Sequence, residues 1–326
     1  MPARQTRVFR LYQEGSGDPL QTDRMKPLLI IGGATGTGKS DIAVACAKLL
    51  DGEVVSCDSM QIYRGLDVGT AKIRPEETQG VLHHMIDVVD PKDTFTAAEY
   101  KTQAVKIIQS IYEKGKVPIL CGGTGLYVNA VLYDLSFSGE FDEELRASLL
   151  AEAKERGKEY MHKKLASLDP EAAARLHVND EKRVIRAIEK ALTGGTKEND
   201  FAKPKYPYLM FVTDLPREMM YDRINMRVDK MMQAGLKAEV DGLLRQGVDF
   251  DKQCMQAIAY KEWKAVKDGE MTEAEVVELI KKNTRNYAKR QVTWFKQYKD
   301  AIKIDVLGRS SEEIAKEITI KYNEGL

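Results

Sequence analysis

The chain has 326 residues, of which 43% are apolar and 31% charged, and its 50 Lys and Arg balance 50 Asp and Glu. This composition is typical of a globular protein and excludes a disordered, collagen-like or disulfide-scaffold chain. The zero net charge gives no electrostatic indication of a nucleic-acid or membrane partner. At this length we expect two domains, or one domain with an insertion, rather than one very large core.

The N-terminus and the cysteines bear on the compartment. Residues 1–25 contain several Arg but no continuous apolar segment, so they are not a secretory signal. We treat them as an N-terminal extension, either vector-derived or natural. No apolar run approaches the ~18 residues of a membrane span, and the four cysteines lack paired metal-ligand spacing, which indicates buried reduced thiols. We therefore expect a cytoplasmic protein that does not contact membranes. We also expect a monomer, although no sequence feature determines the oligomeric state.

Short β-rich runs alternate with amphipathic helices from residue 26 to residue 138, which predicts the first part of a parallel α/β core. Helices are expected at Ser40–Leu50 and Thr96–Lys114. Two further apolar runs follow much later in the chain, so residues 201–326 are expected to complete this core and to add C-terminal helices. The predicted strands are Leu28–Ile31, Glu53–Cys57, Val117–Cys121, Tyr208–Thr213 and Ala301–Val306.

Residues 139–200 have a different composition, rich in Glu, Ala, Leu, Lys and Arg and without a strand-like run. Asp169-Pro170 is typical of a helix N-cap followed by a first-turn proline, and Asn179-Asp180 indicates a second helix start. A polar, Gly-containing stretch follows Gly194. We interpret residues 139–200 as a helical insertion that interrupts the α/β core.

The strongest motif is Gly33-Ala34-Thr35-Gly36-Thr37-Gly38-Lys39-Ser40, a full match to G-x-x-x-x-G-K-[ST] between an apolar strand and an amphipathic helix. Backbone N–H groups of such a loop wrap a phosphate at the positive end of the helix. Lys39 is expected to reach phosphate oxygens and the Ser40 hydroxyl to bind Mg²⁺. The alternative is a Gly-rich turn with an incidental Lys-Ser pair. The motif indicates a polyphosphate without selecting ATP.

Two further turns follow predicted strands. Asp58 comes directly after Glu53–Cys57, so its carboxylate is expected at the carboxyl edge of the sheet, where it could act as a general base or hold Mg²⁺ through water. A helix N-cap explains Asp58 equally well. Gly122-Gly123-Thr124-Gly125 follows Val117–Cys121 and presents the Thr124 hydroxyl at the same edge, although a tight strand-to-helix turn also accounts for it.

Basic residues cluster in three helical segments. Arg223, Arg227 and Lys230 share a helix face, which is either an anion site or a solvated surface. Residues 268–279 hold five acids and no base, whereas residues 281–299 hold seven bases and no acid, with four interleaved aromatics. Thr272 and Glu275 form a capping box, which predicts one long helix, and its charge order suits either the helix dipole or a phosphate-backbone surface. A third cluster, Lys182, Arg183 and Arg186, is equally ambiguous.

Together these blocks resemble the tRNA dimethylallyltransferases, also called tRNA isopentenyltransferases, over residues 26–298. The order and spacing of six blocks carry the resemblance: Gly33–Ser40; Asp58–Tyr63 with Gly69–Lys72; His83-His84 with Asp87; Gly122–Tyr127; Asn179–Ala187; and Tyr287–Phe295.

The resemblance implies a P-loop NTPase-like core with a helical insertion domain that clamps the anticodon stem of tRNA. It implies transfer of a dimethylallyl group from dimethylallyl diphosphate to N6 of the adenosine 3′-adjacent to the anticodon. It also implies that the Gly33–Ser40 loop binds the donor's pyrophosphate with Mg²⁺, and not a nucleotide. Asp58 matches the general base, Thr124 a pyrophosphate and active-site contact, and Arg227 the arginine that binds the leaving pyrophosphate. The implied tRNA-contacting residues are Ser59, Met60, Gln61, Lys182, Arg183, Arg186, Gln256, Tyr260, Lys261, Lys289, Arg290 and Gln291.

The chain departs from the family pattern at Ala259, where the family usually has Gly, and residues 1–25 precede the usual family start. No Cys follows Cys254, so the zinc finger of eukaryotic members is not expected and a bacterial-type enzyme is favoured.

The rival functions are an adenylate isopentenyltransferase with a free nucleotide as acceptor, a small-molecule P-loop kinase, and a non-catalytic RNA-binding module. The insertion and the basic 281–299 segment favour tRNA over free nucleotide. The kinase would need a phosphoryl-acceptor site and usually an arginine lid, and an RNA-binding module would not need the loop and Asp58 together.

Overall fold

The computed structural model describes residues 26–135, 137, 142–194 and 203–325. The chain divides into two compact units, one formed by residues 1–134 and 202–326 and the other by Leu135–Phe201. The predicted N-terminal extension lies outside the described residues. In the part of the chain that is described, no helix combines the length and the apolar character needed to cross a membrane.

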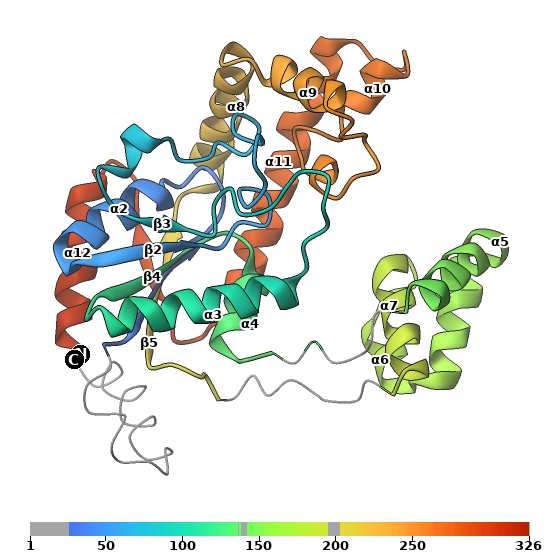
Figure 1. Ribbon diagram of the computed structural model, residues 1–326, viewed down its shortest axis with the longest axis horizontal. Coiled ribbons are helices and arrows are strands. Elements are labelled where there is room, and N and C mark those ends of the chain that lie inside the picture. The colour runs from blue at the N-terminus through green and yellow to red at the C-terminus, as the bar shows by residue number, and fades with distance from the viewer. Residues whose placement is uncertain (1–25, 136, 138–141, 195–202, 326) are drawn as a thin grey trace. The chain divides into compact units, whose positions relative to one another are not determined.

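A parallel sheet forms the centre of the first unit (Figure 1). Its strands lie in the order β3-β2-β4-β1-β5-β6, and every pairing is parallel. The five predicted strands are confirmed to within two residues at each end. The two-residue strand β3 was not predicted, because so short a segment gives no apolar run. The strands are β1 (Leu28–Gly33), β2 (Gly52–Ser56), β3 (His83–His84), β4 (Val117–Gly122), β5 (Tyr208–Asp214) and β6 (Ile302–Asp305).

Helices cover both faces of this sheet. Along β1, Leu28 and Ile30 pack into the apolar cluster that contains α3 (Ala97–Glu113) and α4 (Gly125–Leu132). The alternate residues Leu29 and Ile31 pack into the cluster of α2 (Lys39–Leu50) and α12 (Ser311–Glu324). A strand buried on both faces is apolar throughout, which is why Leu28–Ile31 shows no polar alternation. The α/β core with a parallel sheet is therefore confirmed.

The C-terminal half adds helices near the carboxyl end of the sheet. The long helix α11 (Glu273–Phe295) begins at the predicted capping box, where Thr272 and Glu275 each accept a hydrogen bond from the other's backbone N–H. It contacts α8 (Arg217–Gln233), and the Arg285 guanidinium donates to Asn225 Oδ1 at 2.5 Å. The remaining elements are η1 (Pro75–Thr78), α9 (Leu236–Arg245), η2 (Cys254–Gln256) and α10 (Trp263–Lys267).

The second unit is helical and has its own apolar cluster, formed by residues of α5 (Glu143–Leu168), α6 (Pro170–Arg175) and α7 (Glu181–Leu192). Asp169 caps α6 as its sequence suggests, accepting from Ala172 N at 2.9 Å, with Pro170 in the first turn. The predicted insertion, residues 139–200, falls within this unit. In the first unit, Lys205 N donates to Leu132 O at 2.6 Å, so the two chain segments that flank the insertion are hydrogen-bonded to each other.

All four cysteines are free and buried, as predicted. Burial raises the pKa of the Cys121 thiol to about 12 and that of Cys254 to about 11. Both shifts favour the protonated thiol at neutral pH.

Candidate active site

The register of the sheet brings the motif turns together. Gly32 of β1 pairs with Gly122 of β4, and Ser56 of β2 pairs with Cys121 of β4, so all three strands end at one level. The turn after β2 and the turn after β4 are also joined directly. Thr124 N donates to Cys57 O at 3.0 Å, and Ser59 N donates to Thr124 Oγ1 at 3.2 Å. The sequence prediction that Asp58 and Thr124 share the carboxyl edge of the sheet with the Gly33–Ser40 loop is thus confirmed.

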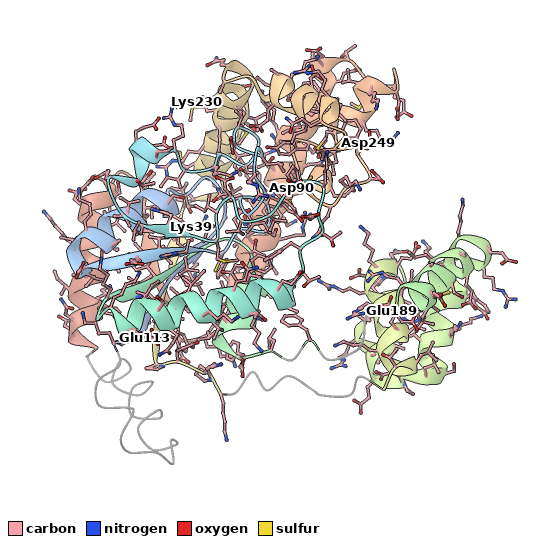
Figure 2. The ribbon with its side chains drawn as sticks, in the orientation of Figure 1. Lys39, Asp90, Glu113, Glu189, Lys230 and Asp249 are labelled. Carbon is pink, nitrogen blue, oxygen red and sulfur yellow. The ribbon has the colours of Figure 1, made fainter. Side chains whose placement is uncertain are left out.

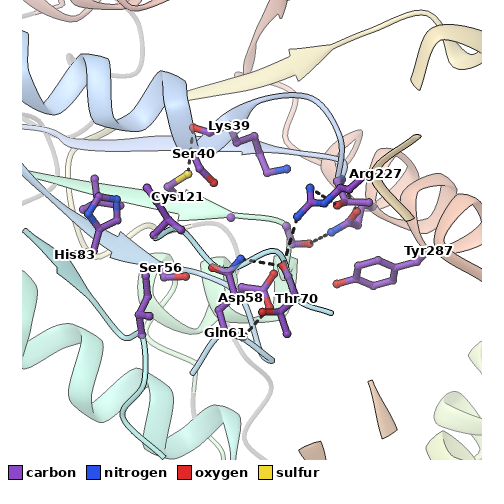
Figure 3. A pocket seen from close by; sticks show the side chains of 17 residues that line it. Lys39, Ser40, Ser56, Asp58, Gln61, Thr70, His83, Cys121, Arg227 and Tyr287 are labelled. Atoms are coloured by element: carbon purple, nitrogen blue, oxygen red, sulfur yellow. Dashed lines mark hydrogen bonds between the residues drawn. The ribbon is translucent and has the colours of Figure 1, made fainter. Parts of the chain in front are cut away.

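Within the Gly33–Ser40 loop, the side chains of Thr35, Lys39 and Ser40 line a cavity (Figure 3). Lys39 Nζ donates to Ala34 O at 2.5 Å, and burial lowers the pKa of Lys39 to about 8. Thr37 does not face this cavity: it is buried, and its hydroxyl donates to Ala34 O at 2.8 Å. The loop therefore presents a cation, two hydroxyls and the N-terminus of α2 on one side, a set of groups that suits a phosphate.

The Asp58 carboxylate is held by its own turn. Oδ1 accepts from Met60 N at 2.8 Å and from Gln61 N at 3.2 Å. The alternative of a helix N-cap is not what the structure shows, because the residues after Asp58 form turns rather than a helix. These two bonds fix the orientation of the carboxylate and are both made to the same oxygen.

Arg227 enters the site from α8. Its Nη1 donates to Thr35 Oγ1 and its Nη2 to Thr70 O, both at 3.4 Å, and Thr70 O also accepts from Gln61 Nε2 at 3.2 Å. Burial lowers the pKa of Arg227, and the nearby Asp58 opposes that shift. An arginine keeps its charge under such conditions, so Arg227 places a cation beside Lys39. By contrast, Lys230, on the same predicted basic face, is exposed on α8 (Figure 2).

Two cavities adjoin each other here. The first is lined mainly by polar groups, including Lys39, Ser40 and Ser56, and the second, of about 290 Å³, has an apolar side formed by Ile224, Val228 and Met231. The predicted contacts Ser59, Met60, Gln256, Lys261 and Arg290 line this second cavity, whereas Gln61 lines the first. The wall that both cavities share consists of Thr35, Asp58, Thr70, Arg227 and Tyr287.

Two side chains predicted to contact tRNA, Tyr260 and Gln291, are buried in the structure, and Gln291 lines the first cavity; their contact with tRNA stays a prediction. Tyr260 has no exposed surface, and its hydroxyl donates to Glu239 Oε1 at 2.5 Å. Gln291 is only 5% exposed, and both ends of its amide bind backbone groups of the phosphate-side turns. The neighbouring Lys289 is exposed and remains available to a ligand on the surface of α11.

The other predicted tRNA contacts are on α7 of the second unit. Lys182 is exposed, Arg183 Nη1 lies 3.3 Å from Asp180 Oδ2, and Arg186 Nη1 lies 2.8 Å from Glu189 Oε2. Glu189 is buried within this unit, where it is labelled in Figure 2. Both arginines thus pair with an acid of the same unit, Arg186 with a buried one, whereas Lys182 and Arg183 are exposed at its surface.

Sequence reasoning missed three residues that build the site. Tyr287 lines both cavities, and burial raises its pKa to about 12, opposed by Thr124 and Gln291. Thr70 supplies the carbonyl that Arg227 and Gln61 bind. Glu239 binds three backbone N–H groups of residues 67–69. A signal existed for Thr70 and Tyr287, because both lie in blocks that carried the family resemblance. The role of the Thr70 carbonyl and the remote carboxylate of Glu239 leave no sequence motif.

The amino-acid sequence is similar to a known protein family and to individual members of it. The family model for IPP transferase matches residues 61–298. A tRNA dimethylallyltransferase of Exiguobacterium sp. is 45% identical over 291 residues, covering 89% of this chain and 93% of the relative. Another tRNA dimethylallyltransferase, from Bacillus cereus, is 43% identical and covers 94% of this chain and 96% of the relative.

Solved structures similar to this chain include tRNA-modifying transferases. The full-length tRNA isopentenylpyrophosphate transferase of Bacillus halodurans superposes with a TM-score of 0.70 at 41% identity, covering 92% of this chain and 98% of that one. A eukaryotic dimethylallyltransferase described as acting on tRNA gives a TM-score of 0.71 at 25% identity, covering 87% and 75%. With a family model over most of its length and relatives of this identity, the chain belongs to the IPP transferase family.

Proposed function

We propose that this chain transfers the dimethylallyl group of dimethylallyl diphosphate to N6 of the adenosine 3′-adjacent to the tRNA anticodon, which forms N6-(dimethylallyl)adenosine. The observation that carries the proposal is the wall shared by the two cavities. One cavity suits a pyrophosphate and the other a flat base with an apolar group, and Asp58 and Arg227 face both. A reaction that joins two substrates needs its reacting atoms at such a boundary.

The first cavity supports the leaving-group half of the reaction. As the allylic C–O bond breaks, negative charge develops on the pyrophosphate, and Lys39 and Arg227 provide cations fixed in place beforehand. The oxygen donors Ser40, Ser56 and Asp58 line the same cavity, and Mg²⁺ prefers oxygen ligands and substrate phosphates. We therefore propose Ser40, together with the pyrophosphate, as the Mg²⁺ site. When bound, Mg²⁺ would neutralise part of the developing charge.

The second cavity supports the acceptor half. An adenine in a stacked loop cannot reach Asp58, so the acceptor base must be flipped out of the anticodon loop. The exposed Lys261 and Arg290 at this cavity can bind the RNA backbone, and Ser59 and Met60 lie next to Asp58. Asp58 Oδ2 then takes the N6 proton as the new C–N bond forms, while Oδ1 stays bonded to the turn. The helical unit of residues 135–201, with Lys182 and Arg183, is proposed to hold the anticodon stem.

The decisive test is incubation of the protein with labelled dimethylallyl diphosphate, Mg²⁺ and total tRNA, followed by nucleoside analysis. We expect label in N6-(dimethylallyl)adenosine at the position 3′ of the anticodon. Transfer to free AMP at a rate comparable to tRNA would favour the adenylate isopentenyltransferase instead. Tight ATP binding with no affinity for dimethylallyl diphosphate would favour a kinase. Because its substrate is tRNA, we propose the cytoplasm as the place of action.

A further inference from the structure

Helix α11 packs its inner face directly onto the turns that build the pyrophosphate cavity. Ala288, Gln291 and Phe295 are buried on one side of the helix, at intervals of three and four residues. A Cβ atom at Gly123 would lie 2.0 Å from Gln291 Nε2, and one at Gly125 would lie 1.9 Å from Trp294 Nε1. These glycines therefore allow the close approach of α11, which is a requirement separate from phosphate binding.

Gln291 makes the closest polar contact across this interface. Its Oε1 accepts from Thr35 N at 2.9 Å, and its Nε2 donates to Gly123 O at 3.1 Å. A backbone N–H can only donate and a carbonyl can only accept, so the two partners fix the orientation of the amide. One side chain thus links the phosphate loop after β1 to the turn after β4. Among side chains of this length, only that of Gln offers both a donor and an acceptor independently of pH.

We propose that Gln291 is a positioning residue for pyrophosphate binding, and that it does not contact tRNA. It sets the spacing between Thr35, which lies in the loop and accepts from Arg227, and the Gly123-Thr124 turn next to Asp58. Lys289 lies two residues earlier, on the exposed side of the same helix. The helix therefore separates two tasks, with RNA contact outside and loop positioning inside. This inference rests on the proposed function, because it takes pyrophosphate as the ligand of the loop.

The test uses Gln291→Met, which keeps the length and approximate volume of the side chain but removes both hydrogen bonds. Titration calorimetry with inorganic pyrophosphate and Mg²⁺ is expected to show a Kd about five- to fiftyfold higher than in the unchanged protein, since each bond contributes modestly. The donor KM should rise by a similar factor, whereas the Kd and KM for tRNA should change less than twofold. The matched control is Lys289→Ala, which should weaken tRNA binding and flatten its salt dependence without changing pyrophosphate affinity.

A second variant guards against misfolding of the first. Gln291→Glu keeps an acceptor for Thr35 N, but its carboxylate cannot donate to Gly123 O and adds a negative charge beside the pyrophosphate. We expect it to bind pyrophosphate more weakly than Gln291→Met. The proposal is overturned if either folded variant binds pyrophosphate like the unchanged protein, or if Gln291→Met weakens tRNA binding alone. If the unchanged protein itself does not bind pyrophosphate, the proposed function fails first, and this inference fails with it.

Discussion

The Tyr260 hydroxyl donates to Glu239 Oε1 at 2.5 Å, and the same carboxylate accepts the backbone N–H groups of Asp67, Val68 and Gly69 at 2.9, 2.8 and 3.1 Å. The phenol ring packs on Gly69, where a Cβ would lie 2.5 Å from it. The next residue, Thr70, presents its carbonyl to Arg227. The buried Tyr260 and the half-buried Glu239 thus fix the segment whose carbonyl binds Arg227.

Tyr260→Phe keeps the ring but removes the hydroxyl, leaving one bond of the Glu239 carboxylate unmade. We expect the free energy of unfolding to fall by about 1.5–3 kcal/mol, the usual contribution of a hydrogen bond to a charged group. Urea unfolding measures it. The control is Tyr221→Phe, whose hydroxyl binds Arg217 Nε at an exposed site and should change stability by less than about 0.5 kcal/mol. Equal losses in the two variants would contradict the assigned role.

Asp58→Asn should preserve the turn, because the amide oxygen can still accept from Met60 N and Gln61 N. The amide cannot take a proton at neutral pH. Single-turnover transfer to a bound anticodon stem-loop is therefore expected to slow by roughly 10²–10⁴-fold, with Kd values for tRNA and donor nearly unchanged. Transfer at the original rate would remove Asp58 from the role of base.

Arg227→Lys should damage donor use even though charge is conserved. A guanidinium reaches Thr35 and Thr70 at once, whereas an ammonium is a single point charge. We expect kcat/KM for dimethylallyl diphosphate to fall by about 10²-fold, within the range for loss of one transition-state donor. Lys230→Met, an exposed change on the same helix, should alter it less than twofold. Unchanged donor kinetics in Arg227→Lys would exclude a leaving-group contact.

Lys39 should titrate far below an ordinary lysine, because burial lowers its pKa to about 8 from the usual ~10.4. The neutral amine has no charge to offer, so pyrophosphate affinity should fall as pH rises through about 8. NMR of lysine-labelled protein, with the Lys39 signal assigned by its loss in Lys39→Arg, measures the midpoint directly. Added pyrophosphate should move that midpoint upward, and a ligand-free midpoint near 10 would contradict the prediction.

Ala259 has φ +78°, a left-handed conformation that costs a residue with a Cβ about 1–2 kcal/mol. Ala259→Gly removes that strain but increases the freedom of the unfolded chain, so a net gain of about 0.5–1 kcal/mol in stability is expected. Ala257 in the same segment has φ −62°, and Ala257→Gly should therefore destabilise the protein. Thermal unfolding of the two variants should give shifts of opposite sign.

Periodicity predicted the sheet core well, because Leu28–Ile31 and Val117–Cys121 are buried on both faces and carry a strong local signal. The motif turns at Gly33–Ser40, Asp58 and Thr124 were also placed at the correct edge. Strand β3 was missed, because two histidines are held there by pairing with β2 rather than by local preference.

The site was harder to predict wherever a side chain acts over a long sequence separation. The spacing of Arg223 and Arg227 indicates a shared face, but only packing against Thr35 and Thr70 shows which arginine enters the cavity. For Gln291 the helical interval to Ala288 and Phe295 did carry the information that it is buried. The basic neighbours Lys289 and Arg290 instead favoured the prediction that Gln291 contacts tRNA.

The insertion also has a consequence for synthesis of the chain. Strand β1 pairs with β4 on one side and with β5 on the other, yet β4 ends at Gly122 and β5 begins only at Tyr208. While the ribosome makes the helical unit, one side of the apolar strand β1 has no partner. Such an open strand edge invites pairing with other chains. This side of β1 gains its partner only when residues 208–214 have been made and can pair with it.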